Sequence, residues 1–257
     1  MNSTKRTKLG MIAALVALAA CGGGGEGGGT STAMNGGGGA SGAAPVPPPS
    51  PAPAPAVPPP PPPSSSPNYA KAVFIGNSIT YSLASPAMGW DHTSGMAASS
   101  AATDYAHLVA AALKVDSPNI TNFSPLERNP SANISGIAEV TAPIDASTAV
   151  TVELGDNVPL DKLAEFSTAY NALLDAIHGK SLVCVSTWWV EPSRDAVIKS
   201  ACDAHGGKFV YIGDVRPDPN NRDHLDGPQY ADPAVEDHPH DWSMARIAER
   251  VIAEQQN

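Results

Sequence analysis

Short apolar runs alternate with helix-forming segments along most of this sequence, and this alternation constrains the fold more than any other feature. The runs predicted to be β-strands are 71–75, 119–123, 148–154, 181–188 and 208–212. The predicted helices are 103–114, 159–177, 193–205 (with Ser193 as N-cap) and 241–252. Strand–helix alternation of this kind predicts an α/β fold, a three-layer α/β/α arrangement around a five-stranded parallel sheet.

The first quarter of the 257-residue chain has a different composition, since glycine and proline are concentrated there. Residues 22–42 are glycine-rich and predict a flexible coil, whereas 45–63 predict an extended polyproline rod of about 60 Å at about 3.1 Å per residue. Neither part has enough apolar surface to fold. We therefore expect a disordered linker at 21–67 and one domain at 68–257, which is long enough for a sizeable core.

Residues 1–20 have the features of an export leader. Basic residues precede an apolar stretch at 11–20, which is too short to span a bilayer as a helix. The stretch ends in Leu18-Ala19-Ala20-Cys21, which resembles the cleavage site of bacterial lipoprotein precursors. The resemblance implies a signal peptide cleaved before Cys21, lipidation of that cysteine, and a mature protein tethered to a membrane outside the cytoplasm. Gly22, in place of aspartate, favours the outer membrane.

The predicted domain is strongly acidic. Three of the 15 basic residues lie in the leader, so the chain without its leader has 12 basic against 25 acidic residues, a net charge of -13, and of these charged residues only Glu26 lies outside the domain. An acidic surface repels phosphate groups, which argues against nucleic acid or an anionic membrane surface as its partner. Contact with a membrane is expected only through the lipid anchor.

Two cysteines fall within the domain, Cys184 in a predicted strand and Cys202 in the following helix. Neither shows the spacing of a zinc site. An oxidising compartment permits a disulfide, but the geometry between a strand and a helix often forbids one. We therefore favour two buried free thiols, with their redox state left open.

Three segments place reactive side chains where α/β proteins usually bind ligands. Ser78 follows the first predicted strand after Gly76, Asn157 follows the third strand, and His238 precedes the last helix. The carboxyl ends of parallel strands share one edge of the sheet. A serine nucleophile, a histidine base and an amide that stabilises an oxyanion are the groups that acyl transfer requires. The alternative is that Ser78 lies in an ordinary turn.

The segments Gly76-Asn77-Ser78, Gly155-Asp156-Asn157 and His238-Pro239 resemble, in this order, the conserved blocks of the SGNH (GDSL-like) hydrolase family. The resemblance covers essentially the whole domain. It implies a flavodoxin-like SGNH hydrolase fold and ester hydrolysis or acyl transfer, with no cofactor and no metal. It also assigns the nucleophile to Ser78, the base to His238 and the oxyanion donor to Asn157.

The segment around His238 departs from the family pattern. Val235 stands where the family has an aspartate, three residues before the histidine. Asp237 is a possible acid, and Glu236 or a main-chain carbonyl could orient the ring instead, the latter leaving a Ser–His dyad. His240, three residues after Asp237, is a rival base. A metal pair of the two histidines lacks a third ligand in the sequence.

The second block also departs, because the glycine expected after Asn122 is missing. Glu127 and Arg128 lie there instead, as an ion pair or as a substrate contact. The expected function is a serine esterase that acts on small acyl (acetyl-type) esters, linked to carbohydrate, so that its partner is a small-molecule or glycan ester. The alternatives are an O-acyltransferase of the same fold and a non-catalytic carbohydrate-binding envelope lipoprotein.

Overall fold

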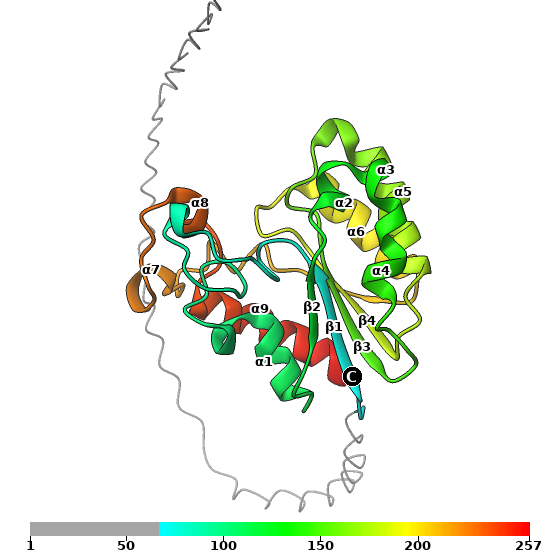
Figure 1. The fold of residues 1–257 in the computed structure, drawn as a ribbon, viewed down its shortest axis with the longest axis horizontal. Helices are drawn as coiled ribbons and strands as arrows, with labels where there is room; N and C mark the ends of the chain where they lie inside the picture. Colours follow the sequence, from blue (N-terminus) through cyan, green and yellow to red (C-terminus); the bar gives the residue numbers. More distant parts are fainter. Residues whose placement is uncertain (1–66) are drawn as a thin grey trace, which may run out of the picture. The chain divides into compact units, whose positions relative to one another are not determined.

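A five-stranded parallel sheet forms the centre of the part of the chain that the computed structural model describes, residues 67–257 (Figure 1). The expected signal peptide (1–20), the expected lipidation site Cys21 and all but the last residue of the expected linker lie outside these residues. The strands are β1 (Lys71–Gly76), β2 (Asn119–Asn122), β3 (Thr148–Glu153), β4 (Ser181–Val185) and β5 (Lys208–Val210). Their order is β2-β1-β3-β4-β5, which is the flavodoxin-like order.

Helices cover both faces of the sheet, so the predicted three-layer α/β/α fold is confirmed. The longer helices are α1 (Tyr105–Ala112), α5 (Leu163–Asp175), α6 (Pro192–Ala204) and α9 (Asp241–Gln256). The short ones are α2 (Pro125–Arg128), α3 (Pro130–Asn133), α4 (Ile137–Thr141), α7 (Asp223–Asp226) and α8 (Pro233–Glu236). Of the helices in this part of the chain, none is both long and apolar enough to cross a membrane.

Strand β1 shows how the sequence builds two cores. Its side chains alternate between the faces of the sheet, as the period of a strand requires. Ala72 and Phe74 belong to the core on the side of α1 and α9, whereas Val73 and Ile75 belong to the core that includes α5 and α6. All four are almost fully buried, which explains why this strand is an uninterrupted apolar run.

The predicted elements are present, with shifted ends. The helix expected at 159–177 is α5 preceded by a short 3-10 turn, Leu160–Lys162. Helix α6 begins at Pro192, one residue before the expected cap, and its N-cap is Glu191, whose side chain accepts a hydrogen bond from the Ser193 N–H. Helix α9 continues four residues beyond its predicted end at 252, to Gln256.

Cys184 and Cys202 form a disulfide, so the expectation of two free thiols is wrong. Cys184 lies in β4 and Cys202 in α6, the helix that follows it and packs back onto the sheet. The Cα atoms are 6.1 Å apart, within the range of about 4.4–6.8 Å that a disulfide can bridge. Both side chains are completely buried in the same core, which brings them together.

The start and the end of the described region lie side by side, next to the first residues of β1 (Figure 1). The Tyr69 hydroxyl donates a hydrogen bond of 2.6 Å to the main-chain oxygen of Gln255. The Gln255 side chain is buried and donates to the Val150 carbonyl at 3.0 Å. These contacts fix the end of α9 against β3.

Candidate active site

Ser78 and His238 meet at the carboxyl edge of the sheet, although 160 residues separate them. Ser78 lies two residues after β1, and His238 lies between α8 and α9. The distance from Ser78 Oγ to His238 Nε2 is 2.9 Å, and both side chains are partly buried. This is the contact that a serine nucleophile and its base require.

The His238 ring is held by packing and by the main chain. The rings of Trp189 and His238 pack edge to face, with 4.9 Å between their centres, and the main-chain N–H of His238 donates to the Val235 carbonyl at 3.0 Å. Burial lowers the pKa of His238 to about 4, against the opposing effects of the Ala234 carbonyl and the Asp237 charge. Nδ1 is buried and, among the described residues, makes no hydrogen bond of ordinary geometry. The ring is therefore neutral and can accept a proton at Nε2.

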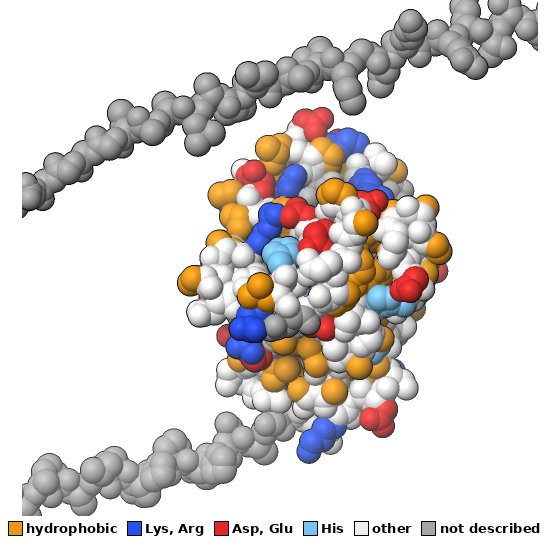
Figure 2. Space-filling view, turned by 90° about the vertical axis from the view of Figure 1, so that its left-hand side faces the viewer, with side chains coloured by type: hydrophobic (Ala, Val, Ile, Leu, Met, Phe, Trp, Pro, Cys, Tyr) orange, Lys and Arg blue, Asp and Glu red, His pale blue; other side chains and the backbone are white. Residues whose placement is uncertain are grey.

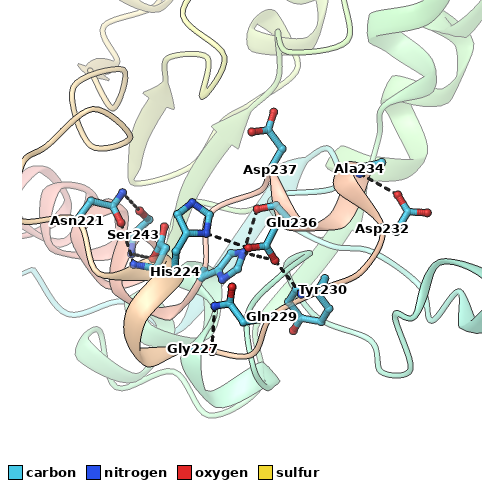
Figure 3. Close-up of polar contacts among 12 residues, drawn as sticks. Asn221, His224, Gly227, Gln229, Tyr230, Asp232, Ala234, Glu236, Asp237 and Ser243 are labelled. Atoms are coloured by element: carbon cyan, nitrogen blue, oxygen red, sulfur yellow. Dashed lines mark hydrogen bonds and ion pairs between the residues drawn. The ribbon is translucent and has the colours of Figure 1, made fainter.

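The Asp237 carboxylate is directed to other partners than His238. It accepts a hydrogen bond of 2.8 Å from the Trp189 indole and forms an ion pair with Arg216. Figure 3 shows it pointing away from the neighbouring Glu236 side chain. Because no carboxylate in residues 67–257 bonds to the His238 ring, the geometry corresponds to the dyad alternative. Asp237 acts on the ring through its charge and through its hydrogen bond to Trp189, which packs against the ring.

Neither Glu236, a candidate to orient the His238 ring, nor His240, the rival base, takes its candidate role. Glu236 contacts the His224 ring and the Tyr230 N–H instead. The rival base His240 is completely buried, and its Nε2 lies 3.0 Å from the Glu236 main-chain oxygen. The structure therefore separates the two histidines of the H-x-H sequence, and only His238 contacts Ser78.

Three carboxyl groups lie beneath the Ser78 turn and surround the Asn77 amide. Asn77 Nδ2 donates to Glu153 at 3.0 Å, to Glu127 at 3.3 Å and to Asp156 at 3.4 Å. Glu153 comes from the end of β3, Glu127 from α2 and Asp156 from the loop after β3. A single buried amide thus ties the turn that carries Ser78 to β3, to α2 and to the loop after β3.

Glu127 is the hydrogen-bond acceptor that orients Asn157. Its carboxylate accepts from the Asn157 amide at 2.7 Å, from the Asn157 N–H at 3.3 Å and from the Gly155 N–H at 2.6 Å. Glu127 is completely buried and serves this loop, so neither an ion pair with Arg128 nor a substrate contact describes its role. An amide has two N–H donors, and Glu127 occupies one of those on Asn157. No hydrogen bond joins Asn157 to Ser78 within the described residues.

The pKa values of the three carboxyl groups are raised. Burial and then the charge of Glu127 raise the pKa of Asp156 to about 7. Burial and the charges of Asp156 and Glu127 raise the pKa of Glu153 well above its usual value. Burial also raises the pKa of Glu127, against the N–H donors of Gly155 and Asn157. At neutral pH this cluster therefore retains protons that exposed acids release.

A hollow of about 570 Å³ opens at Trp189, the residue whose ring contacts His238. Its lining is formed by Trp188, Trp189, Val190, Gly213, Arg216 and Pro217. The Trp188 ring is buried and its indole N–H donates to the Asp237 main-chain oxygen at 2.9 Å, whereas Trp189 is partly exposed and Val190 half-exposed. The hollow thus combines an aromatic wall with an ion pair at its rim.

The buried carboxyl cluster is the part of the site that sequence reasoning missed. Glu153 ends a strand in which every residue is buried. A buried acid needs hydrogen-bond partners, so an acid in this apolar run was the feature of the sequence that could have indicated a buried polar cluster. After Asn122, where the second-block glycine is missing, the Phe123 N–H donates to the Gly76 carbonyl at 2.6 Å, and the Ser124 N–H donates to the Asn122 side-chain oxygen at 3.0 Å. The N–H of Ser124 is therefore not free to bind substrate.

In comparisons with protein-family models and with curated proteins, the sequence matches none. The fold and the site define an α/β protein with flavodoxin-like strand order and a hydrogen-bonded Ser–His pair at the carboxyl edge of its sheet.

Proposed function

We propose that this protein is a serine esterase of the SGNH (GDSL-like) hydrolase type that cleaves small acyl esters, of the acetyl type, from carbohydrate. The contact of 2.9 Å between Ser78 Oγ and His238 Nε2 carries the proposal. It is supported by the order of the three sequence blocks and by the position of the pair at the edge of the sheet where α/β proteins bind ligands.

The reaction begins with proton transfer from Ser78 to His238. As the Oγ–H proton moves to Nε2, Oγ forms a bond to the ester carbonyl carbon, and the carbonyl oxygen becomes an oxyanion. Collapse of this tetrahedral intermediate breaks the bond to the alcohol oxygen, which takes the proton from Nε2 and leaves. Water then attacks the acyl-serine, with His238 again as base, and releases the carboxylic acid and free Ser78.

Two N–H donors serve the oxyanion in this proposal. One is the main-chain N–H of Ser78, which makes no hydrogen bond in the described part of the chain. The other is the Asn157 amide, which Glu127 orients through a hydrogen bond of 2.7 Å. Loss of one such donor typically lowers the rate about 10²- to 10³-fold.

The hollow at Trp189, whose ring contacts His238, supports a carbohydrate-linked substrate. Its aromatic wall at Trp189 provides a surface on which a sugar ring can pack, and its rim carries the Arg216 and Asp237 charges. A tryptophan with one apolar face and a polar edge is well suited to this contact. The indole edge of Trp189 is already fixed by Asp237.

The proposed location is the cell envelope, with the mature protein anchored by a lipid on Cys21. The leader sequence carries this proposal. The disulfide between Cys184 and Cys202 adds support, because such bonds persist in oxidising compartments and are rare in the cytosol. Growth in labelled fatty acid, followed by comparison of wild type with Cys21→Ala, tests the anchor.

Hydrolysis of p-nitrophenyl acetate tests the enzymatic proposal. We expect turnover by the wild type and a loss of at least about 10⁴-fold in Ser78→Ala and in His238→Ala. Ser82→Ala is a matched control, since its hydroxyl hydrogen-bonds, among residues 67–257, only to the carbonyl of its own neighbour, Leu83. Equal turnover by wild type and Ser78→Ala would reject the proposal.

A fluorophosphonate probe separates an enzyme from a binding protein. The probe forms a bond to an activated serine, so labelling is expected at Ser78 of the wild type and not of His238→Ala. An unlabelled wild-type protein that still binds acetylated glycans would favour the non-catalytic alternative. Adding an alcohol acceptor to the acetate assay then distinguishes hydrolysis from acyl transfer, because a transferase makes the new ester in preference to acetate.

A further inference from the structure

His224, Glu236 and His240 form a cluster of potential metal ligands outside the proposed catalytic pair. One ligand atom of each lies within 4.8 Å of the others. His224 Nδ1 is 2.9 Å from one Glu236 carboxylate oxygen, and His240 Nε2 is 3.6 Å from the other. The three residues come from α7, from α8 and from the N-cap of α9. Figure 3 shows Glu236 between His224 and Tyr230, with contacts to both.

This donor set suits a first-row divalent cation of the zinc type. Two imidazoles and one carboxylate are a known zinc ligand set, with a fourth position for water. Hard cations such as Mg²⁺ and Ca²⁺ prefer all-oxygen sites. The Glu236 main-chain oxygen lies 3.0 Å from His240 Nε2 and is a further potential metal ligand at the cluster.

The three side chains of the cluster differ in exposure, so the cluster has one fixed, buried ligand and one side open to solvent. The His240 side chain is completely buried, that of Glu236 is 25% exposed and that of His224 is 67% exposed. A cation can therefore approach from the side of His224 and meet a fixed ligand beneath it. Figure 2, which faces this side of the molecule, shows histidine side chains at the surface beside acidic ones.

The proton balance of the two rings allows binding. A metal takes the lone pair of a neutral imidazole, so the ring proton must sit on the other nitrogen. His240 Nδ1 is buried without a hydrogen-bond partner in residues 67–257, so no contact prevents it from carrying the proton when Nε2 binds. The His224 ring is largely exposed, and water can solvate a proton on its Nε2.

We propose that His224, Glu236 and His240 bind one Zn²⁺-type cation, which cross-links α7, α8 and the start of α9. Helices α7 and α8 have four residues each, and single-turn helices are not stable without tertiary contacts. Glu236 and His240 each lie two residues from His238, so the cation would fix the segment that carries the histidine. Metal binding at this cluster does not depend on esterase activity at Ser78.

Titration calorimetry of the untagged full-length chain, freed of metal with a chelator, tests the proposal with Zn²⁺ as ligand. We expect one Zn²⁺ per chain and much weaker binding of Mg²⁺ and Ca²⁺. In His224→Gln the affinity should fall more than the roughly 10- to 100-fold loss that an outer-shell change causes. Glutamine keeps a donor for Glu236 and replaces an exposed side chain, so this variant retains the fold.

His205→Gln is the matched control. His205 also contacts a carboxylate, with 2.9 Å from its Nε2 to Asp175, but it belongs to no three-residue ligand group in the described region. It should bind Zn²⁺ as the wild type does. Zn²⁺ should also raise the melting temperature of the wild type and of His205→Gln, and not that of His224→Gln. Equal zinc affinity in wild type and His224→Gln would contradict the proposal, and so would an equal loss of affinity in His224→Gln and His205→Gln. Either result would mean that the three residues form hydrogen bonds to one another and no metal site.

Discussion

The imidazole of His238 is fixed without help from a carboxylate, which distinguishes this pair from a Ser–His–Asp triad. In a triad the aspartate holds the ring in one tautomer, and its replacement by asparagine lowers turnover about 10⁴-fold. Here the Trp189 ring and the main chain around Val235 restrain the ring, while Asp237 bonds to Trp189 and Arg216. The difference has a measurable consequence.

Asp237→Asn should lower kcat for p-nitrophenyl acetate by no more than about tenfold, far below the loss expected of a triad acid. The remaining effect comes from a weaker contact with Trp189, whose indole N–H still finds an amide oxygen. Arg216→Gln, which removes the other partner of the carboxylate, serves as control and should have a similar small effect. A loss near 10⁴-fold in Asp237→Asn alone would make Asp237 the acid.

Glu127→Gln should lower kcat about 10²- to 10³-fold with little change in KM, because it disturbs an oxyanion donor. The two carboxylate oxygens of Glu127 accept hydrogen bonds from the Gly155 N–H and the Asn157 amide. In glutamine one of these oxygens is replaced by an NH₂ group, which cannot accept from an N–H, so the orientation of the Asn157 amide is lost. Steady-state kinetics would measure this. Glu165→Gln, at an exposed acid that accepts from Ser131, should leave both constants unchanged. Unaltered kcat in Glu127→Gln would remove Asn157 from the mechanism.

At this scale the sequence could identify residues whose position follows from local pattern. Ser78 and Asn157 follow strands and His238 precedes a helix, so the shared edge of a parallel sheet predicted that they would gather there. The function of Glu127 could not be predicted, because it depends on α2 folding back against the loop after β3. The partner of the Asp237 carboxylate could not be predicted either, because it is Arg216, which lies 21 residues earlier in the sequence.

Among the elements, the disulfide between β4 and α6 should contribute about 2–4 kcal/mol to the free energy of unfolding, since it closes a loop across a sequence separation of 18 residues. Urea denaturation of Cys184→Ala/Cys202→Ala against wild type would measure this. Adding reductant should lower the urea concentration at which half of the wild type is unfolded, and it should leave this midpoint unchanged for the double variant. A wild-type midpoint indifferent to reductant would contradict the assignment.

The elements that the sequence predicted are those with long apolar patterns. Strands β1, β3 and β4 and the four longest helices bury one face, or both, in a core, so their periodicity is clear. Strands β2 and β5 are shorter and contribute fewer core residues. The short helices α2, α3, α4, α7 and α8 have four or five residues, too few to show a period. The disulfide was missed because a sequence does not state which face of α6 meets β4.

For the folded domain as a whole, the buried carboxyl groups should make stability fall as pH rises. The pKa of Asp156 is raised to about 7, so the folded state keeps a proton that the unfolded chain releases near pH 4. The unfolding free energy therefore declines between about pH 4 and 7 and then levels off for this group. Each unit of upward pKa shift corresponds to about 1.4 kcal/mol.

The comparison of wild type with Asp156→Asn isolates this effect. Burial of His238 acts in the opposite direction, because its lowered pKa makes stability rise with pH over part of the same window, but this contribution is common to both proteins. Urea unfolding at pH 4 to 8 should show the variant gaining stability relative to wild type up to about pH 7, with no further gain above it. Parallel curves over the whole range would contradict the prediction.

The hydrogen bond from Tyr69 to Gln255 places both ends of the folded domain at the amino edge of the sheet, while Ser78 lies beyond the opposite edge. Six residues of β1 separate the two edges, about 20 Å at roughly 3.3 Å per residue. The reactive rim and the two ends of the folded domain therefore lie at opposite edges of the sheet. Surface immobilisation through either terminus should accordingly preserve access to the rim.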